Sequence, residues 1–330
     1  MSRAFQSILI LSLAVFVILT VALLPVQAQD DAAPAAMPTV AAPATPTVIP
    51  RPLPAHVLTA ERTTVELYFD GLAQGQTGLI RAVGDGLAGA RARFLNELVD
   101  FFPADDGSFY GLISISMEQT ARTYDLDVLV WYSDNTRQTI NTRVGLVIGA
   151  FVRQEVNVPP DKAYLVDPEI ERNELARLES VFSTVTPSVL WGANGFQLPI
   201  PGAELTSAFG AFRNFNQTMQ TRHTGWDLRA TLGQPVMASA AGRVAYTGLM
   251  DIRGNIVVID HGYGVFTTYC HFSQVHVTRG QTITQGQVLG TVGNTGRTSG
   301  PHFHWEVAVN GEFVDAVQFT QMWKPNAPPA

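Results

Sequence analysis

The sequence has a single cysteine, Cys270, among its 330 residues. One cysteine excludes an intramolecular disulfide, so the folded parts must rely on apolar cores. Cys270 stands between Tyr269 and His271, where a thiol could serve as a metal ligand or a nucleophile. In a regular strand, however, its side chain points away from both neighbours, which favours a buried and inert thiol.

Basic residues are also scarce, with 21 Lys and Arg against 28 Asp and Glu and a net charge of -7. Without a basic stripe to neutralise phosphates, nucleic acid is excluded as a partner. The same balance provides no attraction to anionic lipid. A hydrophobic content of 46% over 330 residues predicts an ordinary globular protein with room for two domains. The sequence contains nothing that indicates an oligomeric state.

Long hydrophobic runs are absent except at the N-terminus, where Ile8–Leu24 follows a short basic start. The small residues Val26 and Ala28 predict a signal peptide over residues 1–28, cleaved after Ala28. A run of about 17 apolar residues also lies at the lower limit for crossing a bilayer, so an uncleaved anchor is the alternative. In both cases we expect export to the cell envelope or the extracellular space.

Residues 29–54 are rich in proline and alanine and predict an extended linker. Residues 55–160 contain several short β-rich runs separated by turn signals, which predict an Ig-like β-sandwich accessory domain. Gly86–Phe102 also fits a helical face, but we expect strand there. Arg62–Pro159 contains no histidine, so a binding or spacing role is expected for this domain.

Residues 161–196 are expected to connect this domain to the next. Asp167 followed by Pro168 is a typical helix start, and apolar spacing predicts a helix over Pro168–Ser183. Residues 197–325 are rich in glycine and β-branched residues and predict a second, all-β domain. Within it, Asn310-Gly311 predicts a type I′ hairpin turn.

Six of the seven histidines lie between residues 223 and 304, and this clustering is the main functional signal. His302 and His304 are two residues apart in a strand pattern, so they are expected to share one face, opposite Phe303 and Trp305. A lone histidine usually belongs to a core, but packing does not explain two on one strand face.

His223 and Asp227 form an H-x-x-x-D motif in a loop that enters a strand. Imidazole and carboxylate are suitable zinc ligands, and three protein ligands leave a fourth position for water. Each of the two motifs is weak evidence alone. A third motif, Tyr269-Cys270-His271, lies between them, and by strand alternation its Tyr269 and His271 should share a face.

Together these motifs resemble the lysostaphin-type (LytM-like) zinc metallopeptidases, which are peptidoglycan endopeptidases. The motifs that carry the resemblance, in order, are Thr206-Ser207-Ala208-Phe209-Gly210, His223-x-x-x-Asp227, Gly233-Gln234-Pro235-Val236, Asp260-His261-Gly262, Tyr269-Cys270-His271, Gly293-Asn294-Thr295-Gly296 and Gly300-Pro301-His302-Phe303-His304-Trp305-Glu306. The resemblance implies a strongly curved antiparallel sheet of the duplicated hybrid motif type, with a long open groove.

The resemblance also implies a role for each matching residue. His223, Asp227 and His304 would bind Zn²⁺, and His271 and His302 would be the catalytic histidines. Which of the two histidines is the base stays open. Because the chain has no H-E-x-x-H motif, histidine must do the work of the glutamate base. The implied substrates are peptide cross-links or stem peptides of peptidoglycan.

The chain departs from the family pattern at two places. Cysteine replaces the alanine that many relatives have before His271, which should be tolerated behind the active face. No tyrosine lies between Ala211 and Arg222, so oxyanion help from a phenol is not expected. Arg213 and Asn216, in the same expected loop, either touch substrate or lie on the surface.

Three other residues have expected supporting roles: His261 structural, His276 on the surface, and Glu306 as a hydrogen-bonding support rather than a ligand. The main alternative function is a non-catalytic envelope regulator or wall-binding protein with a peptidase-like domain. Such proteins lack one or more ligands, whereas this chain has all five site residues. A peptidase that acts on proteins rather than wall peptides is a third hypothesis.

Overall fold

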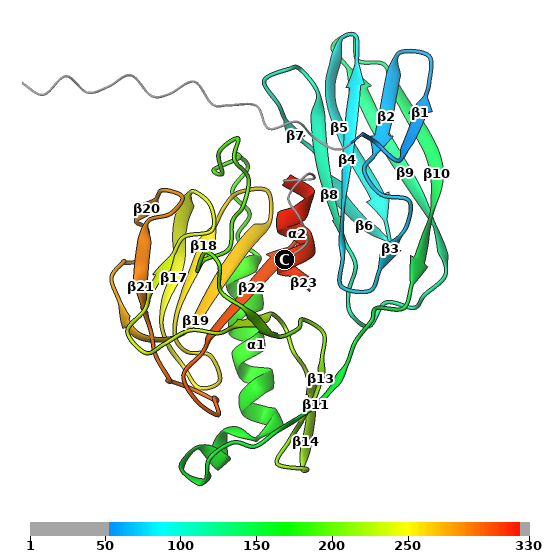
Figure 1. Cartoon of the computed structure of the whole chain (residues 1–330). Helices are drawn as coiled ribbons and strands as arrows, with labels where there is room; N and C mark the ends of the chain where they lie inside the picture. The colour runs from blue at the N-terminus through cyan, green and yellow to red at the C-terminus, as the bar shows by residue number, and fades with distance from the viewer. Residues whose placement is uncertain (1–52, 324–330) are drawn as a thin grey trace, which may run out of the picture. The chain divides into compact units, whose positions relative to one another are not determined.

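The computed structural model describes residues 53–323 (Figure 1). The expected signal peptide, and nearly all of the expected linker, lie outside the described residues. Within residues 53–323, no helix combines the length and the apolar character needed to cross a bilayer. The described part of the chain is mainly β, as the sequence predicts, and contains two α-helices among its many strands.

The first part of the chain forms two five-stranded sheets. In sheet order, one contains β1 (His56–Thr59), β2 (Thr63–Leu67), β4 (Thr77–Gly84), β8 (Phe109–Ser114) and β7 (Phe102–Pro103). The other contains β3 (Leu72–Ala73), β10 (Arg137–Val147), β9 (Thr123–Tyr132), β5 (Leu87–Phe94) and β6 (Glu97–Asp100). Alternate residues of both sheets share one apolar core, which makes the pair a sandwich.

The ambiguous segment Gly86–Phe102 is strand, as expected. It folds into the hairpin β5–β6, whose turn residues Leu95 and Asn96 have φ angles of 52° and 68°. Ala90, Ala92 and Phe94 of β5 are buried at every second position, which a helix would not allow.

Helix α1 (Pro168–Phe182) lies within one residue of its predicted bounds and follows the short 3₁₀ helix η1 (Pro160–Leu165). The Asp167 side chain caps α1 by accepting a hydrogen bond from the Glu169 backbone N–H at 2.8 Å. Three residues of α1 are buried: Leu178, Phe182 and, unexpectedly, Glu174.

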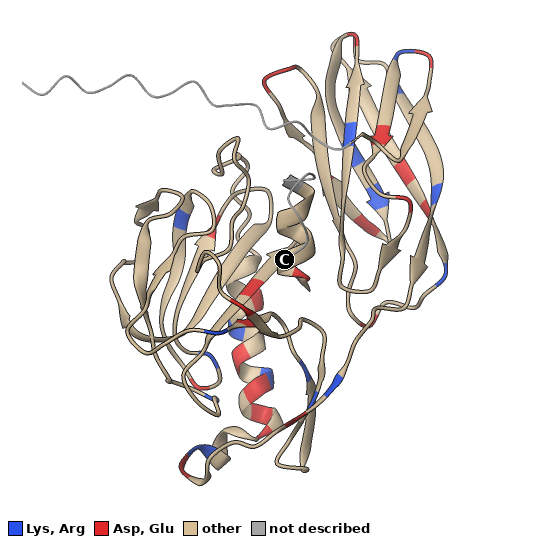
Figure 2. Ribbon diagram, in the orientation of Figure 1, with Lys and Arg blue, Asp and Glu red and all other residues tan. Residues whose placement is uncertain are grey.

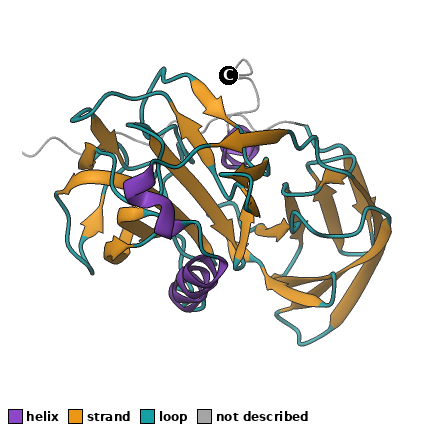
Figure 3. Cartoon of the chain, turned by 90° about the horizontal axis from the view of Figure 1, so that it is seen from below, coloured by secondary structure: helices purple, strands orange, loops and turns teal. Residues whose placement is uncertain are grey.

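A separate, ten-stranded sheet forms the all-β region (Figure 3). Its main path runs β12 (Leu205–Ser207), β15 (Trp226–Leu228), β22 (Phe303–Val309), β19 (Val265–Val275), β18 (Gly254–Asp260), β17 (Gly242–Met250) and β20 (Thr282–Ile283). Off this path, β21 (Val288–Val292) pairs with β19 and with β16 (Pro235–Met237), while β23 (Glu312–Val314) pairs with β22. The short helix α2 (Ala316–Trp323) follows. The Asn310-Gly311 hairpin between β22 and β23 is confirmed, with φ angles of 52° and 84°.

Helix α1 packs on one face of this sheet. Leu178 and Phe182 share an apolar cluster with residues of β17, β18, β19 and β22, among them Cys270 and Ala308. Because β22 carries His304 and β19 carries His271, this packing brings α1 behind the histidine motifs.

A small three-stranded sheet lies beside the large one and corrects an expectation. Residues 212–222 are a hairpin, β13 (Phe212–Phe215) and β14 (Met219–Arg222), rather than a loop. Its turn residues Asn216 and Gln217 have positive φ angles. The pair Asn-Gln predicts a turn less clearly than Asn-Gly does. Strand β11 (Arg153–Val156), at the end of the segment expected to form the sandwich, pairs in parallel with β13.

Strand β19 contains a β-bulge, and two expectations about its side chains are wrong for this reason. Cys270 and His271 together oppose the single residue Ile256 of β18, because the register shifts between Val257 and Asn255. His271 has a φ of 60°, which turns its side chain away from the face of Tyr269. Tyr269 and His271 therefore do not share a face, and Cys270 does not point away from His271.

Candidate metal centre

Two neighbouring antiparallel strands bring Asp227 and His304 together as register partners of β15 and β22. Gly225 permits this close approach, because a Cβ atom there would lie 2.2 Å from the carbonyl oxygen of Trp305. His223, just after β14, completes the group. Its Nε2 lies 3.1 Å from Asp227 Oδ1 and 3.0 Å from His304 Nδ1, and Asp227 Oδ1 lies 2.9 Å from His304 Nδ1.

Hydrogen bonds on the far side of each imidazole fix which nitrogen carries the proton. His223 donates from Nδ1 to the Ala208 carbonyl at 2.8 Å, and His304 donates from Nε2 to Glu306 Oε1 at 3.0 Å. The inward atoms, Nε2 of His223 and Nδ1 of His304, are then lone-pair acceptors. Glu306 has the supporting contact to His304 that the sequence analysis expected.

Two imidazole lone pairs and one carboxylate thus converge within about 3 Å in a buried site. A cation placed between the three atoms would stabilise such an arrangement. The separations are slightly shorter than the edge of about 3.3 Å that a tetrahedron with zinc bonds of about 2.0–2.1 Å would have. The donor set therefore fits a divalent metal, and His223, Asp227 and His304 could hold one.

Burial and neighbouring groups shift the pKa values of all three side chains. Burial would lower the pKa of His304, but its hydrogen bonds to Asp227 and Glu306 raise it. Burial lowers the pKa of His223 to about 4. Burial would raise the pKa of Asp227, but interactions with His223 and with the charge of Arg213 hold it well below its usual value. Asp227 is therefore ionised and His223 is neutral near neutral pH, which are the protonation states of metal ligands.

His271 and His302 lie beside this group as a pair, with ring centroids 4.9 Å apart. His271 donates from Nδ1 to the Thr295 carbonyl at 2.8 Å, and His302 does so to the Gly300 carbonyl at 2.9 Å. Burial lowers the pKa of both, strongly for His271. Each is thus a neutral imidazole with Nε2 available to accept a proton.

A cavity of about 600 Å³ opens beside His302 and Asp227. Residues 154–157, at and just after β11, line one side of it, and residues 297–302 line another. Arg213 also lines it, with Nη2 bonded to Asp227 and, at 2.8 Å, to the Ser207 hydroxyl. Arg213 therefore lies at the site. Asn216 instead accepts a hydrogen bond from the Val158 N–H at 2.8 Å through its side chain.

A second group of potential ligands, Cys270, His304 and Glu306, lies behind the first. The guanidinium of Arg253 already occupies this position, with Nη2 2.6 Å from Glu306 Oε1. Burial, followed by the charge of Glu306, raises the pKa of the Cys270 thiol well above its usual value. The thiol is buried and protonated, as the favoured interpretation of the sequence expected.

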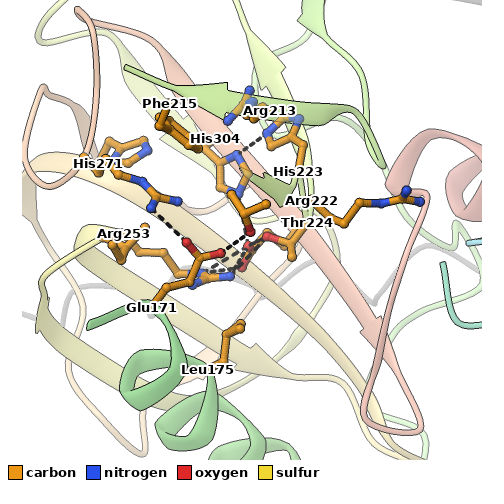
Figure 4. Close-up of a pocket in the computed structure, with 14 residues that line it drawn as sticks. Glu171, Leu175, Arg213, Phe215, Arg222, His223, Thr224, Arg253, His271 and His304 are labelled. Atoms are coloured by element: carbon orange, nitrogen blue, oxygen red, sulfur yellow. Dashed lines mark hydrogen bonds and ion pairs between the residues drawn. The ribbon is translucent and has the colours of Figure 1, made fainter. Parts of the chain in front are cut away.

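The remaining histidine expectations are also confirmed: His276 is exposed, and His261 is fully buried. His261 donates to the Ala241 carbonyl, accepts from the Thr267 hydroxyl, and packs edge-on against Phe196. Sequence reasoning missed the contributions of Arg253 and Glu174, both buried and charged (Figure 4 shows Arg253 below His304).

The part of the chain that contains the five site residues also matches known proteins. Residues 221–316 match the model of peptidase family M23. The chain is 43% identical over 96 residues to the peptidoglycan DD-endopeptidase ShyA of Vibrio cholerae, covering 29% of this chain and 22% of that protein. It is 38% identical over 130 residues to the DD-carboxypeptidase/endopeptidase Mpg of Neisseria meningitidis, covering 39% and 30%. The chain thus spans less than a third of the length of these two relatives.

The crystal structure of a protein from Pseudomonas aeruginosa, described as an M23 peptidase, superimposes on the chain with a TM-score of 0.56 at 25% identity. The superposition covers 75% of this chain and 94% of that one. The structural likeness therefore extends well beyond residues 221–316.

Proposed function

Because residues 221–316 are a domain of peptidase family M23, we propose that the protein is a zinc metalloendopeptidase that hydrolyses peptide bonds in peptidoglycan cross-links or stem peptides. One observation carries the proposal: two imidazole lone pairs and a carboxylate converge beside two further neutral histidines. The curated relatives, named DD-endopeptidase and DD-carboxypeptidase/endopeptidase, support the substrate class.

In this proposal His223, Asp227 and His304 hold Zn²⁺. When bound, zinc supplies a water of lowered pKa and a Lewis acid for the scissile carbonyl. The protein adds the enclosure, since all three ligands are buried, and it fixes both imidazoles through the hydrogen bonds to Ala208 and Glu306.

His271 and His302 move the proton. Either Nε2 can accept the proton of the attacking water, because the Nδ1 proton of each ring is committed to a backbone carbonyl. The imidazolium formed can donate to the oxyanion or to the leaving amine. Because His302 lies 3.5 Å from Asp227 Oδ1 and is the more exposed of the two, it is better placed to meet an entering substrate.

The cavity beside His302 is the place for the substrate peptide. Its walls come from residues 154–157 and residues 297–302 as well as from the ligand strands. The end of the 55–160 segment therefore contributes to substrate binding. An extended peptide can bind such a polar lining through main-chain hydrogen bonds.

The remaining parts complete the proposal. Residues 1–28 act as a signal peptide, or stay as an anchor, and residues 29–54 are a linker that holds the folded part away from a membrane or cell surface. The Ig-like sandwich, residues 55–160, positions substrate or covers the groove, and residues 161–196 connect it to the peptidase domain, residues 197–325. A non-catalytic envelope regulator is the alternative, disfavoured because none of the five site residues is replaced.

Digestion of purified peptidoglycan sacculi by the zinc-loaded protein tests the proposal. We expect the wild type to bind one zinc ion and to release peptides, and His304→Ala to do neither. His276→Ala, which removes an exposed histidine outside the site, is the matched control and should behave as the wild type. Mass spectrometry of the products identifies the bond. Equal activity of the wild type and His304→Ala would refute the proposal.

A further inference from the structure

Glu174 of α1 is a buried carboxylate that lies outside the region that matches the peptidase family. Figure 2 shows several acidic residues along α1, and Glu174 differs from most of them because only 2% of it is exposed. Its oxygens accept hydrogen bonds from the backbone N–H groups of Ile252 and Arg253 at 2.6 and 3.1 Å. Arg253 Nη1 also donates to it at 2.9 Å.

The other side of the Arg253 guanidinium binds Glu306. Arg253 Nε lies 3.0 and 2.9 Å from the two oxygens of Glu306, and Nη2 lies 2.6 Å from Oε1. Thr224 bridges the pair, since its hydroxyl accepts from Nη2 at 3.1 Å and donates to Glu306 at 2.5 Å. A single buried cation therefore pairs with two buried carboxylates and orients both.

Glu306 in turn accepts the Nε2 proton of His304 at 3.0 Å, and this bond directs the Nδ1 lone pair of His304 towards His223 and Asp227. An unbroken line of charged hydrogen bonds thus runs from Glu174 through Arg253 and Glu306 to His304. Figure 4 views this region, with Glu171 and Leu175 of α1 opposite His304.

The turn held by Glu174 also contacts His271. The carbonyl of Arg253 accepts the His271 backbone N–H at 2.9 Å, so the turn that Glu174 holds also supports the bulge at which His271 has a φ of 60°. Removal of the Glu174 carboxylate would leave two buried N–H groups and one guanidinium nitrogen without their partner. The turn, and with it Arg253, would then lose its fixed position.

We propose that Glu174 is a positioning residue of the metal site: α1 holds the ligand His304 in place through Arg253 and Glu306. The inference depends on the proposed function. It implies that the working peptidase unit includes residues 168–182, although the family match begins only at residue 221.

A measurement of zinc affinity tests this inference independently of peptidase activity. It is made on the full mature chain by competition with a chelator of known affinity. Loss of an outer partner of a metal ligand costs about 10–100-fold in affinity, and we expect Glu174→Gln to weaken zinc binding about 10-fold. Glu174→Asp, which keeps the charge on a shorter side chain, should fall between it and the wild type. Glu179→Gln makes the same charge change at an exposed position of α1 and should leave the affinity unchanged.

A double-mutant cycle shows whether the effect passes through Arg253. Arg253→Lys keeps the positive charge but cannot bind Glu174 and Glu306 at the same time as the guanidinium does. In this background the additional change Glu174→Gln should weaken zinc binding by less than about 2-fold. A purely structural role of Glu174 would give independent, multiplying effects. Circular dichroism of the metal-free variants identifies any that do not fold, and Glu174→Asp then carries the comparison.

The outcomes are distinct. A wild type that binds no zinc would overturn the proposed function together with this inference. Two results would overturn the inference alone, provided that the wild type binds zinc tightly. One is equal zinc affinity of Glu174→Gln and Glu179→Gln, and the other is multiplying effects in the double-mutant cycle.

Discussion

Asp227 and His304 face each other as register partners on β15 and β22, with Asp227 Oδ1 2.9 Å from His304 Nδ1. Sheet geometry alone sets this contact, because directly opposed residues of antiparallel strands have side chains on the same face. His223 arrives from a different element, the hairpin β13–β14. The site therefore depends on one rigid strand pair and one neighbouring hairpin.

The Asp227→Asn variant tests the need for ligand charge at this pair. Asparagine keeps the shape of the side chain but has no negative charge to offset that of the cation. Because loss of an outer partner already costs about 10–100-fold, we expect zinc affinity and peptide release to fall by at least about 100-fold. Zinc analysis after dialysis and sacculus digestion measure both. Full zinc retention with full activity would exclude Asp227 as a ligand.

Substitution of His271 separates proton transfer from metal binding. His271 has a φ of 60°, so His271→Asn is a better test than alanine, since asparagine tolerates this backbone conformation. We expect zinc to stay bound, because His271 supplies no ligand atom, and turnover to fall by about 10²–10⁴-fold, the usual contribution of a general acid or base. Zinc content and single-turnover rates are the measurements. Loss of zinc would instead assign His271 to the ligand set.

Features of the site that depend on neighbouring residues in the sequence could be predicted. Features that depend on distant residues could not. His304 lies in β22 and His302 directly precedes that strand, and both approach Asp227, as local strand alternation predicts. The Asn310-Gly311 hairpin also follows from a local turn signal. The bulge at Cys270 and His271 was not predictable, because it depends on the register between β18 and β19. The five site residues came from motif order and resemblance rather than from any distance.

The sequence also did not indicate which charged residues of the site are buried. Glu174 lies among other charged residues of an amphipathic helix, where a glutamate normally faces solvent. Its burial depends on Arg253, 79 residues away in the chain, and no local pattern pairs the two. The hairpin β13–β14 was missed because its turn, Asn216-Gln217, lacks the glycine that usually marks such a turn.

Cys270 provides a test of the thiol alternatives. The thiol is fully buried, and burial together with the Glu306 charge raises its pKa, so we expect no reaction with iodoacetamide in the folded protein and full reaction in denaturant. Cys270→Ala should keep zinc binding and peptide release and should lower the free energy of unfolding by roughly 1 kcal/mol, since it removes only the buried sulfur. Loss of zinc in this variant would show that the thiol belongs to the metal site.

His261 predicts how stability depends on pH, away from the metal site. Burial lowers the pKa of His261 to about 4, compared with an ordinary value of 6.5 in the unfolded chain. Between these pH values the unfolded state binds the proton and the folded state does not. The free energy of unfolding should therefore be highest above pH 6.5 and should fall as the pH falls towards 4, with His261 contributing up to about 3 kcal/mol of the loss.

The His261→Gln variant isolates this contribution, because glutamine can donate to the Ala241 carbonyl and accept from Thr267 without titrating. Urea unfolding at several pH values between 7 and 4, in one metal state, should give a flatter dependence for His261→Gln than for the wild type. The exposed His276→Gln should follow the wild-type curve. If the His261→Gln curve instead runs parallel to the wild type over this range, the acid sensitivity arises from other histidines, and burial does not suppress protonation of His261.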